Sequence, residues 1–273
     1  MTTLSILTIC RNDKSNLAST IRSVEAQYQG PDEFIVLDGA STDGTVEFLE
    51  KCKAVTAWKS EPDAGIADAF NKIAKLATSE WVLFLNAGDI LAGADLVGAV
   101  KDYLSTMSED VGVCYGDALV VDPSERQQTK IQRGNHFLTT HDTPICHQAA
   151  FIRRKLQIEN PYDIRLRIGM DYDLWHRLTT KCKFQRIDSM ICHYRLGGMS
   201  SSKSWGEHSI IAHHMVDWLN TSHRKLGIQD VWQLFNSVIV YRLKKRIEGI
   251  VGERVYIKMK HAIASRRFTA RAI

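Results

Sequence analysis

Short apolar runs alternate with helix-like segments over the first hundred residues. The runs occupy residues 4–10, 34–37, 55–58 and 81–85, and the helix-like segments lie between them at 15–27, 45–53 and 66–77. In the last segment the apolar residues fall on one helical face, namely Ile66, Ala69, Phe70, Ile73, Ala74 and Ala77. This alternation with short links predicts an α/β fold with right-handed crossovers and a mainly parallel sheet.

The alternation weakens after residue 100. Residues 111–121 predict one or two strands, residues 169–181 a helix and residues 184–194 a further strand. Residues 122–147 are polar and lack a period, which is typical of a flap. We find no internal repeat and no low-complexity tract.

Composition narrows the class of protein. The 273 residues are 44% hydrophobic and 24% charged, which is ordinary for a globular protein and excludes disorder. No uncharged apolar stretch is long enough to predict a membrane-spanning helix. The N-terminus lacks the basic lead of a signal peptide, and the six cysteines have neither CxxC nor metal-site spacing. We therefore expect reduced thiols and a cytoplasmic location.

The last fifty residues are much more basic than the rest of the chain. From residue 224 onward there are 12 Lys/Arg and 3 Asp/Glu, although the net charge of the chain is only +4. One helical stripe contains Trp232, Phe235, Ile239, Leu243, Ile247 and Ile250, beside the basic Arg242, Lys244, Lys245 and Arg246. Residues 231–271 thus fit either peripheral contact with an anionic membrane or a helix packed on the core. We expect a domain at 1–215 and a basic helical extension at 216–273.

Polar residues mark the ends of the predicted strands, where ligands of open α/β sheets bind. Known nucleotide and metal motifs do not account for them. The first glycine is Gly30, which excludes a dinucleotide-binding loop after the first strand, and Thr45 replaces the lysine of a P-loop. Ala40 and Thr42 stand at ligand positions of an EF-hand, so that loop is also excluded.

Five motifs in order resemble those of family 2 glycosyltransferases. They are VLDGASTDGT (36–45), SEPDAGI (60–66), AFN (69–71), FLNAGD (84–89) and GMDYDLW (169–175). The resemblance spans roughly residues 4–200. It implies the GT-A fold, which is an α/β nucleotide-binding sandwich, and an inverting, usually metal-dependent transfer from a nucleotide-diphospho-sugar, here a UDP-sugar.

The resemblance assigns the donor to residues at the strand ends. Asp38 accepts hydrogen bonds from the base or ribose in this assignment, since an ionised carboxylate is an acceptor. Asp43 is expected to fix the turn and cap the next helix. The full donor set that the resemblance implies is Thr8, Arg11, Asp38, Asp63, Asn71, Asn86 and Arg195.

A divalent ion is also implied. Asp89 matches the residue that holds Mn²⁺ or Mg²⁺ against the diphosphate, and His193 is a further candidate ligand. The family's acidic run is reduced here to Asn-Ala-Gly-Asp, so only its last carboxylate is present.

Asp171 matches the catalytic base, which removes the proton of the acceptor hydroxyl. Met170 replaces the first acid of the family's usual pair, and Asp173 is a less favoured alternative base. His147 and Gln148, placed on a short strand, resemble the acceptor-side segment.

The implied acceptor is a glycan or lipid-linked glycan, and no nucleic-acid partner is expected.

Two other classes of protein also fit the sequence. One is a sugar-1-phosphate nucleotidyltransferase, although the loop after the first strand lacks its glycines. The other is a non-catalytic protein that binds sugar nucleotides or nucleic acid, which the reduced acidic motif and the basic tail would suit.

Overall fold

The computed structural model describes residues 2–121, 129–132 and 145–196. Its first half alternates strands and helices as the apolar pattern predicts. These elements are β1 (Leu4–Cys10), α1 (Lys14–Glu25), β2 (Glu33–Asp38), α2 (Thr45–Leu49), β3 (Ala57–Ser60), α3 (Ile66–Leu76) and β4 (Trp81–Phe84).

The second half contains shorter and more varied elements. They are β5 (Ile90–Leu91), α4 (Leu96–Ser105), β6 (Val111–Val121), β7 (Thr129–Gln132), the 3-10 turn η1 (His147–Ala149), β8 (Ala150–Arg153), α5 (Arg154–Glu159), α6 (Met170–Thr179) and β9 (Lys183–Arg195).

The strands of both halves form one sheet in the order β3-β2-β1-β4-β8-β6-β9-β5, with β7 paired to β6. β1 pairs in parallel with β2 and β4, and β2 in parallel with β3. β8 is antiparallel to both of its neighbours, whereas β6 and β9 are parallel to each other. The sheet is therefore mixed and mainly parallel on the side of the first half, as predicted.

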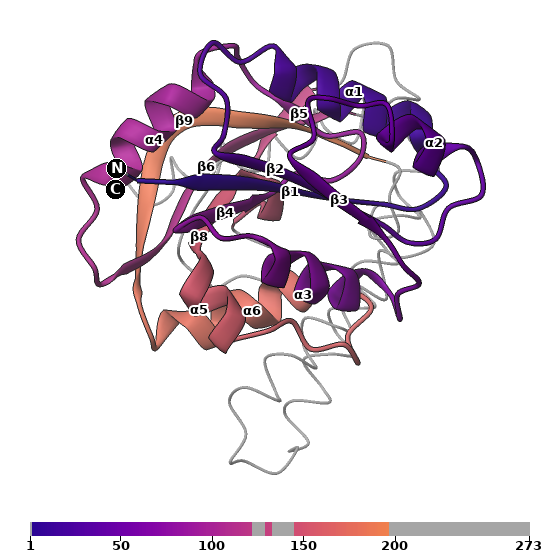
Figure 1. Cartoon of the computed structure of the whole chain (residues 1–273). Helices are drawn as coiled ribbons and strands as arrows, with labels where there is room; N and C mark the ends of the chain where they lie inside the picture. The colour runs from indigo at the N-terminus through magenta and orange to yellow at the C-terminus, as the bar shows by residue number, and fades with distance from the viewer. Residues whose placement is uncertain (1, 122–128, 133–144, 197–273) are drawn as a thin grey trace, which may run out of the picture. The chain divides into compact units, whose positions relative to one another are not determined.

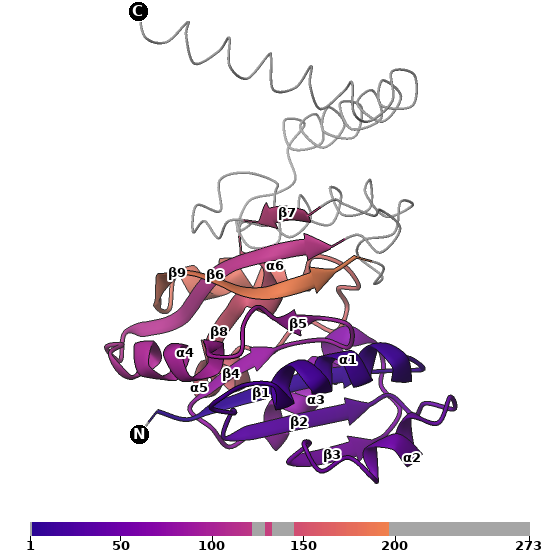
Figure 2. The ribbon, with the colours of Figure 1, turned by 90° about the horizontal axis from the view of Figure 1, so that it is seen from above.

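Helices cover both faces of this sheet (Figures 1 and 2). Apolar residues of α1, α2 and α4 pack in one buried cluster with one set of strand side chains, including Leu4 and Ile6. Apolar residues of α3, α5 and α6 pack in a second cluster with the opposite set, including Leu7. Because strand side chains alternate between faces, each buried strand contributes to both layers of the core.

Several predicted boundaries are wrong. β3 begins two residues later than expected, and α2 ends at Leu49 rather than near residue 53. His147 and Gln148 lie in the turn η1, directly before β8, and not on a strand. β7 lies inside the segment predicted as a flap. The remainder of that segment, 122–128 and 133–144, is outside the described residues.

The predicted C-terminal extension, with its basic stripe and residues 231–271, also lies outside the described residues, so the domain boundary stays a prediction. None of the helices in the described ranges is long and apolar enough to span a bilayer.

Candidate active site

The predicted site residues gather at one edge of the sheet, which we call the carboxyl edge. Parallel β1, β2 and β4 all end there, so the loops that follow them lie side by side. β8 runs antiparallel to β4, with Phe151 level with Leu83, and therefore begins at the same edge. Since η1 directly precedes β8, it also lies there. The carboxyl edge thus combines loops from both halves of the chain.

Asp38 ends β2 and is fully buried. Its carboxylate accepts hydrogen bonds from the Ser41 backbone N–H (2.9 Å), the Ser60 hydroxyl (2.7 Å) and the Ser41 hydroxyl. These bonds hold the turn that follows β2 against β3. They leave about one of the four acceptor positions of the carboxylate for a ligand.

Asp43 has the turn-fixing role expected of it. One carboxylate oxygen accepts from the backbone N–H of Thr45, the first residue of α2 (3.2 Å), and from its hydroxyl. The other accepts from the Lys14 N–H (3.0 Å). The hydrogen bonds with Thr45 and Lys14 lower the pKa of Asp43. Asp43 therefore links the loops after β1 and β2.

A glycine separates two predicted donor-binding residues. A Cβ atom at Gly39 would lie 2.6 Å from Asp63 Oδ2 and 3.2 Å from Arg11 Cδ, both closer than ordinary contacts. Gly39 is buried, Asp63 is half-buried and Arg11 is exposed. Absence of a side chain at position 39 lets Arg11 and Asp63 approach the backbone from different loops. Arg11, Asp38 and Asp63 therefore share one corner of the carboxyl edge.

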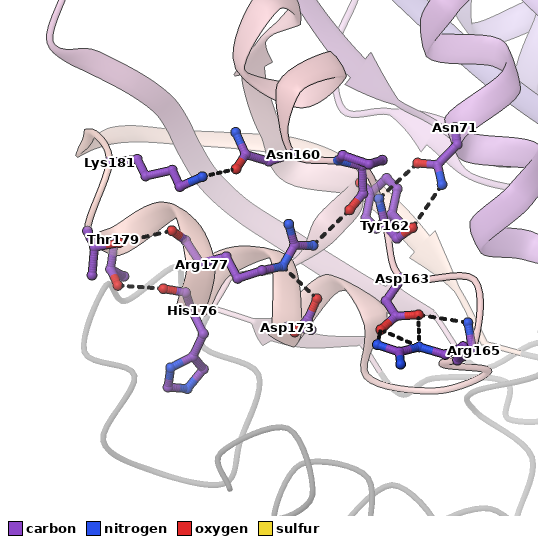
Figure 3. Close-up of polar contacts among 12 residues, drawn as sticks. Asn71, Asn160, Tyr162, Asp163, Arg165, Asp173, His176, Arg177, Thr179 and Lys181 are labelled. Atoms are coloured by element: carbon purple, nitrogen blue, oxygen red, sulfur yellow. Dashed lines mark hydrogen bonds and ion pairs between the residues drawn. The ribbon is translucent and has the colours of Figure 1, made fainter. Parts of the chain in front are cut away.

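Thr8 and Asn71 are bonded within the protein. The buried Thr8 hydroxyl donates to the Leu85 carbonyl, which joins β1 to the residue after β4. Asn71 donates from Nδ2 to the Tyr162 carbonyl and accepts at Oδ1 from the Tyr162 N–H, both at 2.8 Å (Figure 3). Because their polar side-chain atoms form hydrogen bonds within the protein, we do not include either residue among the donor contacts proposed below.

Asp89 lies in the turn between β4 and β5 and is only 3% exposed. Its Oδ1 accepts from the Arg195 backbone N–H (3.0 Å), and among the described residues no cationic side chain pairs with it. Burial raises the pKa of the Asp89 carboxyl to about 7, although backbone hydrogen bonds with Arg195 and Asn86 oppose the rise. The Asn86 Oδ1 atom is buried and has no hydrogen-bond partner in the described part of the chain.

The predicted His193 and Arg195 flank this turn from β9. His193 is the register partner of Ile90, the residue after Asp89. The Arg195 guanidinium donates to the Asn16 amide oxygen, and its Cδ lies 3.3 Å from where a Cβ at Gly88 would stand. Gly88 has φ +98°, a conformation that favours glycine. Within residues 2–121, 129–132 and 145–196, no three His, Cys, Asp or Glu side chains form a ready metal cluster.

His147 is buried in an aromatic cluster and is 6% exposed. Its ring stacks on Phe84 at 5.1 Å and lies 4.9 Å from Phe70, measured between ring centroids. Its Nε2 lies 2.5 Å from the Tyr162 hydroxyl. Burial lowers the pKa of His147 to about 4, and the neighbouring Asp171 carboxylate opposes this shift. The imidazole is therefore neutral at pH 7, and its surroundings do not resemble those of a surface acceptor contact.

The two carboxylates of the first turn of α6 have different surroundings. Asp173, 7% exposed, pairs with Arg177 one turn later (2.9 Å), and Arg177 also donates to the Pro161 carbonyl (Figure 3). Asp171 is half-buried, and no described residue forms a hydrogen bond or ion pair with its carboxylate. Two residues turn a helix by about 200°, so the two side chains point to different sides. Of the two carboxylates in this turn, Asp171 is therefore the one that could accept a proton from a bound molecule without first breaking an ion pair with a described residue.

Sequence reasoning missed Tyr162, which connects Asn71 to His147 but lies in a segment without periodicity. A detectable signal existed for Asp173, because an acid four residues before an arginine on a helix predicts an ion pair. Gln148, predicted on the acceptor side, is half-buried and accepts from the Cys146 thiol at 3.3 Å.

The chain is similar to known proteins. Residues 5–159 match the family described as glycosyl transferase family 2. An uncharacterized glycosyltransferase of Mycobacterium tuberculosis (strain CDC 1551 / Oshkosh) is 31% identical over 207 residues, which cover 74% of this chain and 78% of the relative.

Two solved structures are similar in fold. S. aureus TarS in complex with UDP has a TM-score of 0.59 and 14% identity, covering 79% of this chain and 65% of that one, so this chain spans slightly under two thirds of it. The mannosyltransferase PcManGT from Pyrobaculum calidifontis, in complex with GDP-Man and Mn²⁺, has a TM-score of 0.58 and 15% identity, covering 97% and 80%. The family match spans more than half of the chain, and the protein therefore belongs to the family 2 glycosyltransferases and has their GT-A fold.

Proposed function

We propose that the protein transfers a sugar from a nucleotide-diphospho-sugar to a hydroxyl group with inversion at the anomeric carbon. The donor nucleotide binds at the corner formed by Arg11, Asp38 and Asp63, and its diphosphate extends toward Asp89 and Arg195. The loops after β2 and β4 lie on either side of β1, and this separation supports the proposed placement of the two ends of the donor. Both a UDP complex and a GDP-Man complex occur among the structural neighbours, so we propose a UDP-sugar as the first donor to test and GDP-mannose as the second.

Asp171 acts as the general base in this proposal. The acceptor oxygen forms a bond to the anomeric carbon while the bond from that carbon to the diphosphate oxygen breaks. The acceptor proton passes to the Asp171 carboxylate, and the nucleoside diphosphate leaves with the electron pair. The observation that carries this assignment is the contrast between the two acids: Asp173 pairs with Arg177, whereas the Asp171 carboxylate has no hydrogen-bond or ion-pair partner among the described residues.

The residues around Asp89 suit a divalent cation. Burial raises the pKa of the Asp89 carboxyl, and no cationic side chain of the described residues pairs with it. The buried Asn86 Oδ1, which lacks a hydrogen-bond partner within the described ranges, adds a second hard oxygen. We propose that these two atoms hold Mn²⁺ or Mg²⁺, with His193 as a further ligand and donor phosphate oxygens completing the shell. When bound, such an ion supplies Lewis-acid stabilisation of the departing diphosphate.

For the acceptor we propose a glycan or a lipid-linked glycan, as in bacterial polysaccharide biosynthesis. Gln148 is the remaining predicted acceptor contact, because His147 is buried.

The first prediction separates the two acids of α6. Asp171→Asn is expected to lower the turnover number by about 10²–10⁴-fold, because it removes the proton acceptor. Asp173→Asn is the matched control: it weakens the pair with Arg177 and lowers the melting temperature but keeps turnover within about threefold. Nucleoside diphosphate release from UDP-glucose, UDP-N-acetylglucosamine and GDP-mannose, with octyl glycosides or water as acceptor, measures both. Full turnover by Asp171→Asn would contradict the assignment.

The second prediction concerns the metal. UDP with Mn²⁺ is expected to raise the melting temperature more than either alone, since ligands that bind only the native state stabilise it. Asp89→Asn removes the joint effect but keeps the hydrogen bond from Arg195, because an amide oxygen still accepts. Isothermal titration of UDP with and without Mn²⁺ tests the same point without relying on activity. An undiminished joint effect in Asp89→Asn would place the ion elsewhere.

A non-catalytic protein that binds sugar nucleotides would bind UDP in the titration but release no nucleoside diphosphate from the donor panel. A sugar-1-phosphate nucleotidyltransferase would instead form pyrophosphate from a sugar 1-phosphate and a nucleoside triphosphate, which a separate pyrophosphate-release assay detects.

A further inference from the structure

The segment that connects α5 to α6 is held at three successive residues. The Asn160 amide oxygen accepts from Lys181, and the Pro161 carbonyl accepts from Arg177 (2.9 Å) (Figure 3). The backbone N–H and C=O of Tyr162 both bond to Asn71 on α3. These contacts join the segment to α6 on one side and to α3 on the other, so they fix the path of the chain into α6.

The Tyr162 side chain adds a fourth attachment. Its ring is 2% exposed and lies among Phe70 and Phe84 at centroid distances of 5.3 Å and 5.8 Å. Its hydroxyl meets Nε2 of His147, which belongs to η1. Both polar groups are buried, and a buried polar atom that loses its partner is strongly unfavourable. The Tyr162–His147 bond therefore couples η1 to the start of α6.

The same pair lies beside the proposed base. Asp171 is an electrostatic neighbour of both side chains: its charge acts to raise the pKa of His147 and adds to the burial that raises the pKa of Tyr162. Gly169, with φ +72°, is the last residue of this segment and directly precedes Met170, the first residue of α6. A shift of the segment would therefore move the first turn of α6 and its carboxylate.

We infer that Tyr162 and His147 form a positioning pair that fixes Asp171 relative to the reacting carbon, with neither side chain contacting substrate. This inference rests on the proposed function. It changes the role of His147 from an acceptor contact to a support beneath the base. A displacement of about 1 Å in a catalytic group can lower a rate by about 10²-fold, so loss of the pair should affect turnover more than donor binding.

The experiment is a double-mutant cycle with Tyr162→Phe and His147→Leu. Each single change is expected to lower the turnover number by about tenfold while the donor KM stays within about twofold. Because the two side chains act through one bond, the double variant should be about as impaired as either single variant. His147→Gln keeps a polar atom near the position of Nε2 and should recover part of the turnover.

Tyr103→Phe is the matched control. It removes a tyrosine hydroxyl that donates to the Arg186 carbonyl (3.0 Å) on β9, and its turnover should equal that of the wild type. The melting temperature of each variant is measured as well, because a variant that has lost turnover but keeps the wild-type melting temperature is folded and has lost only the positioning of Asp171.

Nucleoside diphosphate release from the donor panel above, with water and octyl glycosides as acceptors, gives the readout. Wild-type turnover in Tyr162→Phe, additive losses in the double variant, or no recovery in His147→Gln would overturn the inference. The proposed function would survive each of these results, provided that the wild type is active and Asp171→Asn is not. An inactive wild type across the panel would instead overturn the proposed function, and the positioning role with it.

Discussion

At the residue scale, the acidic side chains differ in what already bonds to them. Asp38 and Asp43 hold turns, Asp173 pairs with an arginine, and Asp89 is buried and pairs with no cationic side chain of the part of the chain that the structure describes. All four are aspartates within the motifs that the sequence analysis identifies. Only the neighbours brought by the fold distinguish a carboxylate that supports a loop from one that can bind a cation.

Glu33 shows the supporting role most fully, at the opposite edge of the sheet. It begins β2 and accepts hydrogen bonds from the Ser5 hydroxyl and from the backbone N–H and hydroxyl groups of Thr78 and Ser79. Burial alone would raise the pKa of Glu33, but these hydrogen bonds outweigh it and lower the pKa to about 2. The carboxylate thereby ties the starts of β1, β2 and β4 together.

This pKa predicts how stability depends on pH. The folded pKa of about 2 is below the ordinary value of 4.5, so the ionised carboxylate stabilises the fold above about pH 4.5, and the contribution is lost as the pH falls toward 2. Glu33→Gln is expected to lower the free energy of unfolding by about 1–3 kcal/mol at pH 7. The difference from wild type should shrink between pH 5 and pH 3, as urea denaturation can measure.

Glu25→Gln is the control, because the exposed Glu25 side chain makes no hydrogen bond within the described residues. It should leave stability unchanged at every pH. A Glu33→Gln difference that is the same at pH 7 and pH 3 would show that the charge of Glu33 is not what stabilises this edge.

At the element scale, the sequence predicts the first half of the fold well because each element there has a clear period or an unbroken apolar run. β1 and α3 begin at the predicted residues, and β6 matches its predicted range. The short β5 was not predicted, and the short strand expected at His147 and Gln148 begins only at Ala150, since two to four residues do not establish a period. α4 did carry a signal, as Leu96, Val97, Val100 and Leu104 lie on one buried face.

The candidate site was predictable to the extent that it follows strand ends. Asp38 and Asp89 are found where parallel strands place them, because the edge of the sheet follows from topology alone. The role of Asn71 was not predictable, since it depends on Tyr162, which is 91 residues away in the sequence. The burial of His147 likewise depends on rings from α3, β4 and α6 that assemble only in the folded chain.

At the scale of the whole molecule, the uneven distribution of charge predicts membrane binding by a segment that lies outside the described residues. Residues 224–273 hold 12 of the 35 Lys/Arg of the chain but only 3 of the 31 Asp/Glu. An acceptor carried on a lipid would be presented at an anionic membrane surface, and a basic amphipathic segment would keep the enzyme near it. We therefore expect the full chain to bind phosphatidylserine-containing vesicles and to lose binding as the salt concentration rises.

The decisive variant reverses the four charges beside the apolar stripe, Arg242, Lys244, Lys245 and Arg246, to glutamate. Each basic residue near an anionic surface contributes about 1 kcal/mol, so vesicle affinity should fall by on the order of 10²-fold or more. Reversal of the exposed Arg22, Lys51, Lys53 and Lys75 changes the net charge equally and should affect binding far less. Equal losses in both variants would mean that only net charge matters. Unchanged vesicle binding with a lowered melting temperature in the tail variant would instead favour a helix that packs on protein.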